Sequence, residues 1–219
     1  MNQDVDAVRE RVSKLHAELV HNRLASWTMG NISERVPGTE LMVIKPSGVL
    51  YPDLTPESMV VVDLDGNVVD GELSPSSDTA THAYVYRALG EIGGVVHTHS
   101  PYATAWAASG EPIPCVLTAI ADEFGGEIPL GPFARIGGEE IGQGIVATLA
   151  NSRSRAVLMR SHGVFTIGAD ARDAVKAAVM CEEAARTVLL ARGLGELTPL
   201  SPDDVDALYE RYQNVYGQR

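Results

Sequence analysis

Three histidines in this sequence have the spacing of metal ligands. His97 and His99 stand two residues apart in an otherwise apolar run, and His162 follows a later apolar run. In a strand, residues i and i+2 face the same side with Cα atoms roughly 6–7 Å apart, so His97 and His99 can both reach one ion at N–metal distances of ~2.0–2.1 Å. Three imidazoles leave one coordination position open for a substrate. This donor set favours zinc, although manganese, cobalt or iron(II) would also fit.

Asp78 and His82 are further candidates because they lie one helical turn apart and could both face the same ion. We therefore include Asp78 among the candidate metal ligands. Any one of these histidines, taken alone, could instead be an ordinary hydrogen-bonded side chain near a sheet edge. His16 and His21 lie on the opening helix, and we predict a solvated or packing role for both.

Three short segments could together bind an anion. Pro75-Ser76-Ser77-Asp78 precedes a helical pattern, which places two hydroxyls and free backbone N–H groups at a positive helix end. Lys45-Pro46-Ser47-Gly48 adds a cation, a hydroxyl and a glycine that lets the backbone come close, and Gly30-Asn31 adds an amide from a separate turn. Each segment alone could be a helix cap or a simple turn. Together they could neutralise a phosphate.

Hydrophobic periodicity predicts the elements that must position these side chains. Apolar residues three and four apart indicate helices, and short β-branched runs indicate strands, two of them joined in a hairpin at Asp65-Gly66-Asn67. The predicted helices are 4–25, 79–89, 139–149, 171–191 and 203–212, with another beginning near Pro101; the predicted strands are 41–45, 59–63, 68–69, 95–99, 156–159 and 164–167. We expect loops at 46–56 and 129–138. Hairpins mixed with strand–helix alternation favour an α/β sandwich with a mostly antiparallel or mixed sheet.

Length and composition restrict the class of protein. A chain of 219 residues with 45% hydrophobic residues can bury one substantial core, so we expect a single domain over residues 1–219. The net charge of −12 argues against nucleic-acid and anionic-membrane partners, which attract cationic surfaces. Cys115 and Cys181 have no partner motif and are predicted to be small core residues in a reducing compartment. The sequence shows no signal peptide or membrane-spanning run, so we expect the cytoplasm. Trp27 and Trp106 are predicted core or pocket-wall residues.

The ordered motifs resemble the class II aldolase/L-ribulose-5-phosphate 4-epimerase family from about residue 10 to the end. The matching motifs are Gly30-Asn31-Ile32-Ser33, Ile44-Lys45-Pro46-Ser47-Gly48-Val49, Pro75-Ser76-Ser77-Asp78-Thr79, Gly93-Gly94-Val95-Val96-His97-Thr98-His99-Ser100 and Ser161-His162-Gly163. The resemblance implies a three-layer α/β/α sandwich, a homotetramer with active sites between subunits, and a zinc-like metal on three histidines. It also implies that phosphate is surrounded by Asn31, Lys45, Ser47, Gly48, Ser76 and Ser77.

The same resemblance implies a reaction. Asp78 leans toward the epimerase branch, because aldolases of the family tend to carry Glu there as an acid/base. The implied activity is retro-aldol cleavage of L-ribulose 5-phosphate between C3 and C4, followed by re-addition on the other face to give D-xylulose 5-phosphate. Two proton carriers are needed, one for each face of the aldehyde, and by resemblance these are Asp122 and Tyr216.

Two other functions remain open at this stage. A class II aldolase acting on L-fuculose 1-phosphate or a related sugar phosphate would share the metal and the phosphate pocket. A non-catalytic domain like the head of the adducins is more remote, since it has no reason to keep three metal-ligand histidines. The chain departs from the usual epimerase in a shorter segment between 129 and 150 and in lacking an expected histidine upstream of Tyr216. These departures bear on substrate choice more than on chemistry.

Overall fold

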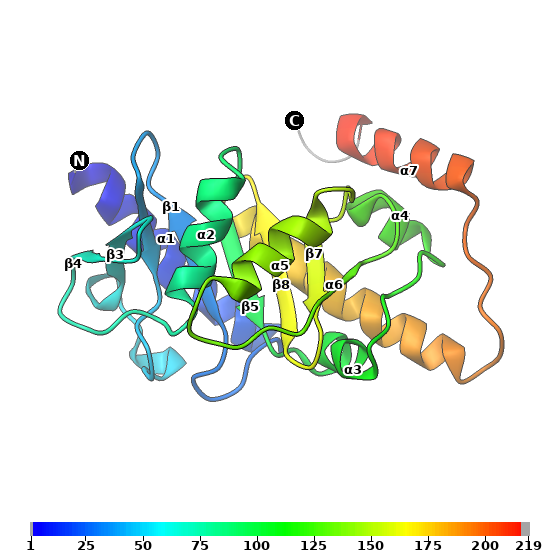
Figure 1. The fold of residues 1–219 in the computed structure, drawn as a ribbon, viewed down its shortest axis with the longest axis horizontal. Coiled ribbons are helices and arrows are strands. Elements are labelled where there is room, and N and C mark those ends of the chain that lie inside the picture. The colour runs from blue at the N-terminus through cyan, green and yellow to red at the C-terminus, as the bar shows by residue number, and fades with distance from the viewer. Residues whose placement is uncertain (1, 216–219) are drawn as a thin grey trace.

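A computed structural model describes residues 2–215 and shows a central sheet covered by helices on both faces (Figure 1). Within the described chain, eight strands form one sheet in the order β4-β3-β2-β1-β5-β8-β7-β6. All neighbouring strands are antiparallel except β6 and β7. The strands are β1 (Asn31–Arg35), β2 (Leu41–Ile44), β3 (Val60–Asp63), β4 (Val68–Asp70), β5 (Gly94–Thr98), β6 (Leu130–Gly131), β7 (Ala156–Met159) and β8 (Gly163–Gly168). The prediction of a mostly antiparallel mixed sheet is confirmed.

The helices make the two outer layers of an α/β/α sandwich. Helices α2 (Thr79–Ala88) and α5 (Glu140–Leu149) pack on one face, while α1 (Asn2–His21) and α6 (Ala171–Arg192) pack on the other. The same face as α6 also carries three further helices: α3 (Pro101–Ser109), α4 (Thr118–Phe124) and α7 (Pro202–Val215). Short 3₁₀ turns occupy Tyr51–Asp53 and Pro56–Ser58.

Strand β5 lies in the middle of the sheet and is buried along its whole length. Its successive residues point to opposite faces, as the pleat requires: Val95 belongs to the core under α2 and α5, and Val96 to the core under α1 and α6. This two-sided burial explains why apolar residues stand next to each other at Val95 and Val96 instead of alternating with polar ones.

Strand β1 was missed in the sequence, where Gly30-Asn31 was expected to be a turn. Its sequence Asn-Ile-Ser-Glu-Arg lacks apolar alternation, yet all but the last residue are buried. Burial is tolerated because the polar side chains find partners. Ser33 Oγ lies 2.7 Å from His82 Nδ1 and 2.9 Å from Tyr86 Oη, and Glu34 accepts hydrogen bonds from the Arg11 guanidinium.

Other differences from the predicted elements are local. Helix α4 and the short β6 were not predicted, the opening helix ends at His21 rather than at residue 25, and the strand predicted over 95–99 ends at Thr98. The remaining predicted helices and strands are present within a few residues.

The burial predicted for the cysteines and for Trp106 is confirmed, whereas the prediction for Trp27 is not. Trp106 is buried, and Cys115 and Cys181 are buried free thiols, as expected. Trp27 is 76% exposed, so its assignment to the core or to a pocket wall was wrong. Trp27 lies in the irregular segment between α1 and β1, and its own φ is +58°.

No helix within residues 2–215 is both long and apolar enough to cross a membrane. The single domain over 1–219 stays a prediction.

His16 fastens α1 to the start of β1. Its ring is buried, Nδ1 lies 2.7 Å from the Val12 carbonyl oxygen, and Nε2 accepts a hydrogen bond from the Ile32 amide at 3.1 Å. Because Nε2 must accept, Nδ1 carries the proton and the ring is neutral. Burial lowers the pKa of His16 to about 3, with the Lys45 charge adding to the effect. Of the two roles predicted for His16, packing is confirmed; His21 is exposed.

We predict that His16 makes the fold sensitive to acid. The unfolded chain takes up this proton near pH 6.5, whereas folded His16 resists it down to about pH 3, so stability is complete above pH 6.5 and falls as the pH drops through that window. Between pH 7 and pH 5 the wild type should lose about 2 kcal/mol more unfolding free energy than His16→Gln, whose side-chain oxygen still accepts but does not titrate. Urea unfolding of metal-free protein measures this. Equal losses in both proteins would contradict it.

Candidate active site

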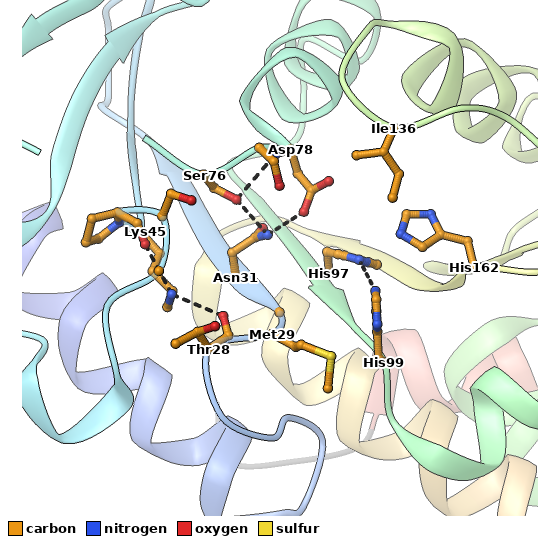
Figure 2. Close-up of a pocket in the computed structure, with 15 residues that line it drawn as sticks. Thr28, Met29, Asn31, Lys45, Ser76, Asp78, His97, His99, Ile136 and His162 are labelled. Atoms are coloured by element: carbon orange, nitrogen blue, oxygen red, sulfur yellow. Dashed lines mark hydrogen bonds between the residues drawn. The ribbon is translucent and has the colours of Figure 1, made fainter. Parts of the chain in front are cut away.

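The three predicted metal ligands converge at one end of the central strands. His97 is in β5, His99 follows it directly, and His162 lies in the turn between β7 and β8. The Nε2 atoms of His97 and His99 are 2.9 Å apart, and one ring nitrogen from each of the three histidines lies within 4.8 Å of the others. Figure 2 shows His97 and His162 side by side, with His99 next to His97. The predicted convergence of the three imidazoles is therefore present.

The ring of His97 is held in place by two residues of β8. Its Nδ1 lies 3.0 Å from the Val164 carbonyl oxygen, so Nδ1–H donates and the lone pair of Nε2 faces the other imidazoles. Phe165, its direct partner across the ladder, stacks on the ring at 4.1 Å between centroids and 13° between planes. Burial lowers the pKa of His97 to about 3 despite the opposing charge of Asp78, and burial also lowers the pKa of His99 and His162. All three rings are thus neutral, as metal ligation requires.

His162 is presented by a tight turn. Ser161 adopts the left-handed conformation with φ of +59°, and its amide donates to the Ala107 carbonyl oxygen at 3.0 Å, which ties the turn to α3. The Nδ1 atom of His162 is buried and has no hydrogen-bond partner among residues 2–215. A buried nitrogen left without a partner, inside a group of three neutral imidazoles, fits a divalent metal ion.

Gly163 lets the strands approach closely beneath the rings. A Cβ at this position would lie 2.6 Å from the Thr98 carbonyl oxygen, 3.1 Å from His99 Cδ2 and 3.3 Å from His97 Cε1. The first of these distances is too short for real atoms, and the atom concerned belongs to the backbone of β5. The glycine of the Ser-His-Gly motif is therefore required by packing under the site.

Asp78 and His82 do not join this group of ligand atoms within the described chain. Asp78 Oδ2 accepts a hydrogen bond from Asn31 Nδ2 at 2.7 Å and lines the same cavity. Burial alone would raise the pKa of Asp78, but His97, His82 and the Asn31 amide together hold it below the ordinary value. His82 is fully buried and faces Ser33 instead of the cavity, and burial lowers its pKa to about 4. A metal-ligand role for Asp78 stays a prediction.

One cavity of about 290 Å³ joins the histidines to the predicted anion site. All six predicted phosphate-binding residues line it: Asn31, Lys45, Ser47, Gly48, Ser76 and Ser77. In Figure 2, Asn31 lies between Lys45 on one side and the imidazoles on the other. The three histidines thus lie at one end of the cavity, which we call the metal end, and the predicted phosphate-binding residues lie at the other, which we call the anion end.

Lys45 is the cation of the anion end and is almost fully buried. Its Nζ donates to the carbonyl oxygens of Pro46 at 3.1 Å and Thr28 at 3.3 Å, which leaves one of its three donors unused by these contacts. Burial lowers the pKa of Lys45, and an anion bound beside the ammonium would oppose that shift.

Sequence reasoning missed part of the lining. Thr28, Met29 and Ile136 also face the cavity, the last two with 46% and 60% of their surface exposed. Tyr51 holds the loop of Thr28 and Met29 in place by donating to the Met29 carbonyl oxygen at 2.6 Å. The sequence offers little to single these residues out, because they lie in irregular segments that show no hydrophobic periodicity.

Of the two predicted proton carriers, Asp122 does not line the cavity within the described chain. Asp122 lies on α4, with one carboxylate oxygen buried and without a hydrogen-bond partner in residues 2–215, and the other 3.7 Å from the Arg211 guanidinium. Tyr216 lies outside the described residues.

Comparison with known proteins decides the family. The sequence profile of the class II aldolase and adducin N-terminal domain matches residues 10–189. The chain belongs to this family. A similar solved structure is an L-fuculose 1-phosphate aldolase, 29% identical, with a TM-score of 0.89 over 94% of this chain and 96% of that one.

Two further structures of the class II aldolase group are similar to this chain. A putative aldolase/epimerase/decarboxylase from Klebsiella pneumoniae is 28% identical, with a TM-score of 0.82 over 93% of this chain and 98% of that one. An L-fuculose-1-phosphate aldolase from Thermus thermophilus is 27% identical, with a TM-score of 0.72 over 90% of this chain and all of that one (100%). Class II aldolases typically use a divalent metal and bind sugar phosphates, in agreement with the histidine cluster. The family is confirmed, and the epimerase branch stays a prediction.

We predict that Gly163→Ala disrupts the metal ligands. The added methyl group must push β8 away from Thr98 or displace the rings of His97 and His99, so divalent-metal affinity should fall and unfolding free energy should drop by about 1–3 kcal/mol. Metal titration and urea unfolding measure the two effects. Gly90→Ala is the matched control, because no atom lies within 4 Å of a Cβ there. Unchanged metal affinity in Gly163→Ala would contradict the prediction.

Proposed function

We propose that this protein is a metal-dependent epimerase that interconverts L-ribulose 5-phosphate and D-xylulose 5-phosphate by retro-aldol and aldol steps. The observation that carries the proposal is the single cavity in which three neutral imidazoles face a buried lysine and a cluster of serines. A sugar phosphate has a carbonyl that a metal on the imidazoles could bind and a phosphate that the lysine and serines could bind.

Zinc is the metal we propose for His97, His99 and His162, with manganese, cobalt or iron(II) as alternatives. When bound, the metal would take up the negative charge that develops as the bond next to the carbonyl breaks. The protein's own groups do the remaining work. The Lys45 ammonium and the hydroxyls of Ser76 and Ser77 would hold the phosphate, while Asn31 keeps the Asp78 carboxylate oriented through the 2.7 Å hydrogen bond.

The two proton carriers of the proposal, Asp122 and Tyr216, would come from a neighbouring subunit of a homotetramer. Asp122 does not line the cavity of its own chain within the described residues. The cavity mouth also carries exposed apolar side chains, Met29 and Ile136, and Trp27 lies exposed two residues from Met29. Exposed apolar groups beside a polar site are what a second subunit would cover. The cytoplasm remains the compartment we propose, because both cysteines are free thiols.

A class II aldolase acting on L-fuculose 1-phosphate is the second candidate. It is favoured by the 29% identity with an L-fuculose 1-phosphate aldolase over almost the whole chain. Asp78 favours the epimerase, because the aldolases of the family tend to use Glu there as an acid/base. The non-catalytic adducin-like alternative is disfavoured by the three converging imidazoles.

We predict that purified, metal-loaded protein converts L-ribulose 5-phosphate into D-xylulose 5-phosphate. A chelator should abolish turnover, and so should His99→Ala, which removes one of the three ligands. Product formation is followed with a coupled assay, and L-fuculose 1-phosphate is tested in parallel. Release of dihydroxyacetone phosphate from the latter, without epimerisation of the former, would establish the aldolase instead. Full turnover by His99→Ala would refute the metal assignment.

We predict that two inactive variants restore activity in mixed oligomers. His99→Ala damages the metal half of a site and Asp122→Asn damages the proposed neighbouring half, so random co-assembly should give about a quarter of the sites both intact halves. The variants are co-expressed with two different tags, purified through both, and assayed for epimerisation.

The control for this experiment is co-expression of His99→Ala with His162→Ala, because both substitutions damage the same half. That pair should stay inactive. If the pair of His99→Ala and Asp122→Asn also stays inactive although the mixed oligomer forms, the sites do not lie between subunits.

A further inference from the structure

The N-terminus of α3 lies directly after the metal-ligand candidate His99. Strand β5 ends at Thr98, which pairs with Val164 in the ladder, so His99 and Ser100 are not held by strand pairing. Their position depends on the two elements that they join. Whatever fixes the first turn of α3 therefore also limits where the imidazole of His99 can lie.

The backbone N–H groups of that first turn are satisfied by an unusual partner. Ser100, the N-cap, makes no side-chain capping hydrogen bond in the described chain, and Pro101 has no N–H to offer. The Thr104 amide bonds to the Ser100 carbonyl oxygen at 2.9 Å, which leaves the amides of Tyr102 and Ala103. Both donate to Glu182 on α6, at 2.9 Å to Oε1 and 2.8 Å to Oε2.

Glu182 is therefore a capping residue supplied from another helix, about 80 positions along the chain. Its carboxylate meets the positive end of α3, where a negative charge is favoured, and both of its oxygens are used. A second bond joins the same two helices: Trp106 Nε1 donates to the Ala185 carbonyl oxygen at 3.0 Å. Residues 182 and 185 lie on one face of α6, so α3 is attached there at two points.

We propose that Glu182 is a positioning residue for the metal site, acting through α3 on His99. Neutralising its carboxylate leaves one of the two amides, that of Tyr102 or that of Ala103, poorly paired and frees the first turn of α3 to shift. Because His99 is two residues before Pro101, that shift moves its ring relative to His97 and His162. The inference rests on the proposed metal site and assigns to Glu182 no contact with metal or substrate.

The test compares Co²⁺ binding by metal-free wild type, Glu182→Gln and Glu183→Gln, using the visible absorption of bound Co²⁺. Gln keeps the size of Glu and one acceptor oxygen, so the variant should fold, which circular dichroism and urea unfolding verify. Glu183 is the matched control because it is the next residue on α6, is exposed and contacts only Arg186 at 3.7 Å among the ion pairs of the described chain. Glu182→Asp, which keeps the charge but is one methylene shorter, is the second variant.

We expect Glu182→Gln to lower Co²⁺ affinity by about tenfold or more and to change the shape of the Co²⁺ spectrum, since residues that orient metal ligands typically have effects of this size. Glu182→Asp should lower affinity in the same direction, and Glu183→Gln should match the wild type. Equal affinity and an identical spectrum in wild type and Glu182→Gln would overturn this inference alone, even if that variant unfolds more easily. Absence of Co²⁺ binding by the wild type would overturn the proposed metal site itself.

Discussion

The exclusion of water from the imidazole of His97 is the constraint on which the site depends. His97 is buried in β5, where its ring stacks on Phe165 of the neighbouring strand β8. A protonated imidazole would be costly in this environment. The ring therefore stays neutral, and its hydrogen bond to the Val164 carbonyl oxygen turns Nε2 toward His99. The layers of helices on both faces of the sheet exclude water from this strand. The neutral donor set therefore depends on the global fold.

Strand β1 links the two ends of the cavity. It is short and mostly polar, its first four residues are buried, and three of its polar side chains have partners: Asn31 bonds to Ser76 and Asp78, Ser33 to His82, and Glu34 to Arg11 and the α6 N-terminus. A polar strand in the middle of a sheet is tolerated only when such partners exist. The same bonds that make β1 compatible with the core thus also place the amide of Asn31 in the site.

The convergence of the three histidines and most of the helices and strands could be predicted from the sequence, whereas the roles of the site residues stay predictions. The His-x-His pair follows from the two-residue period of a strand, and the anion residues follow from turn and helix-start chemistry, so short local patterns sufficed. Strand β1 could not be found in this way because its burial depends on Tyr86, His82 and Arg11, which are distant in the chain. Trp27 was assigned to the core or a pocket wall from its residue type alone, and Glu182 gave no local signal because its partners are about 80 residues away. Long-range polar pairing is what one sequence, read locally, does not reveal.

The direct pairing of Asn31 with His97 in the antiparallel ladder has a geometric consequence. One side chain belongs to the anion end of the cavity and the other to the metal end, and a slip of a single residue would turn one of them to the opposite face of the sheet. The separation between these two backbone positions is thus fixed by strand pairing and not by side-chain rotation. A ligand that spans both ends therefore has to carry its two binding groups at a spacing that matches this backbone distance.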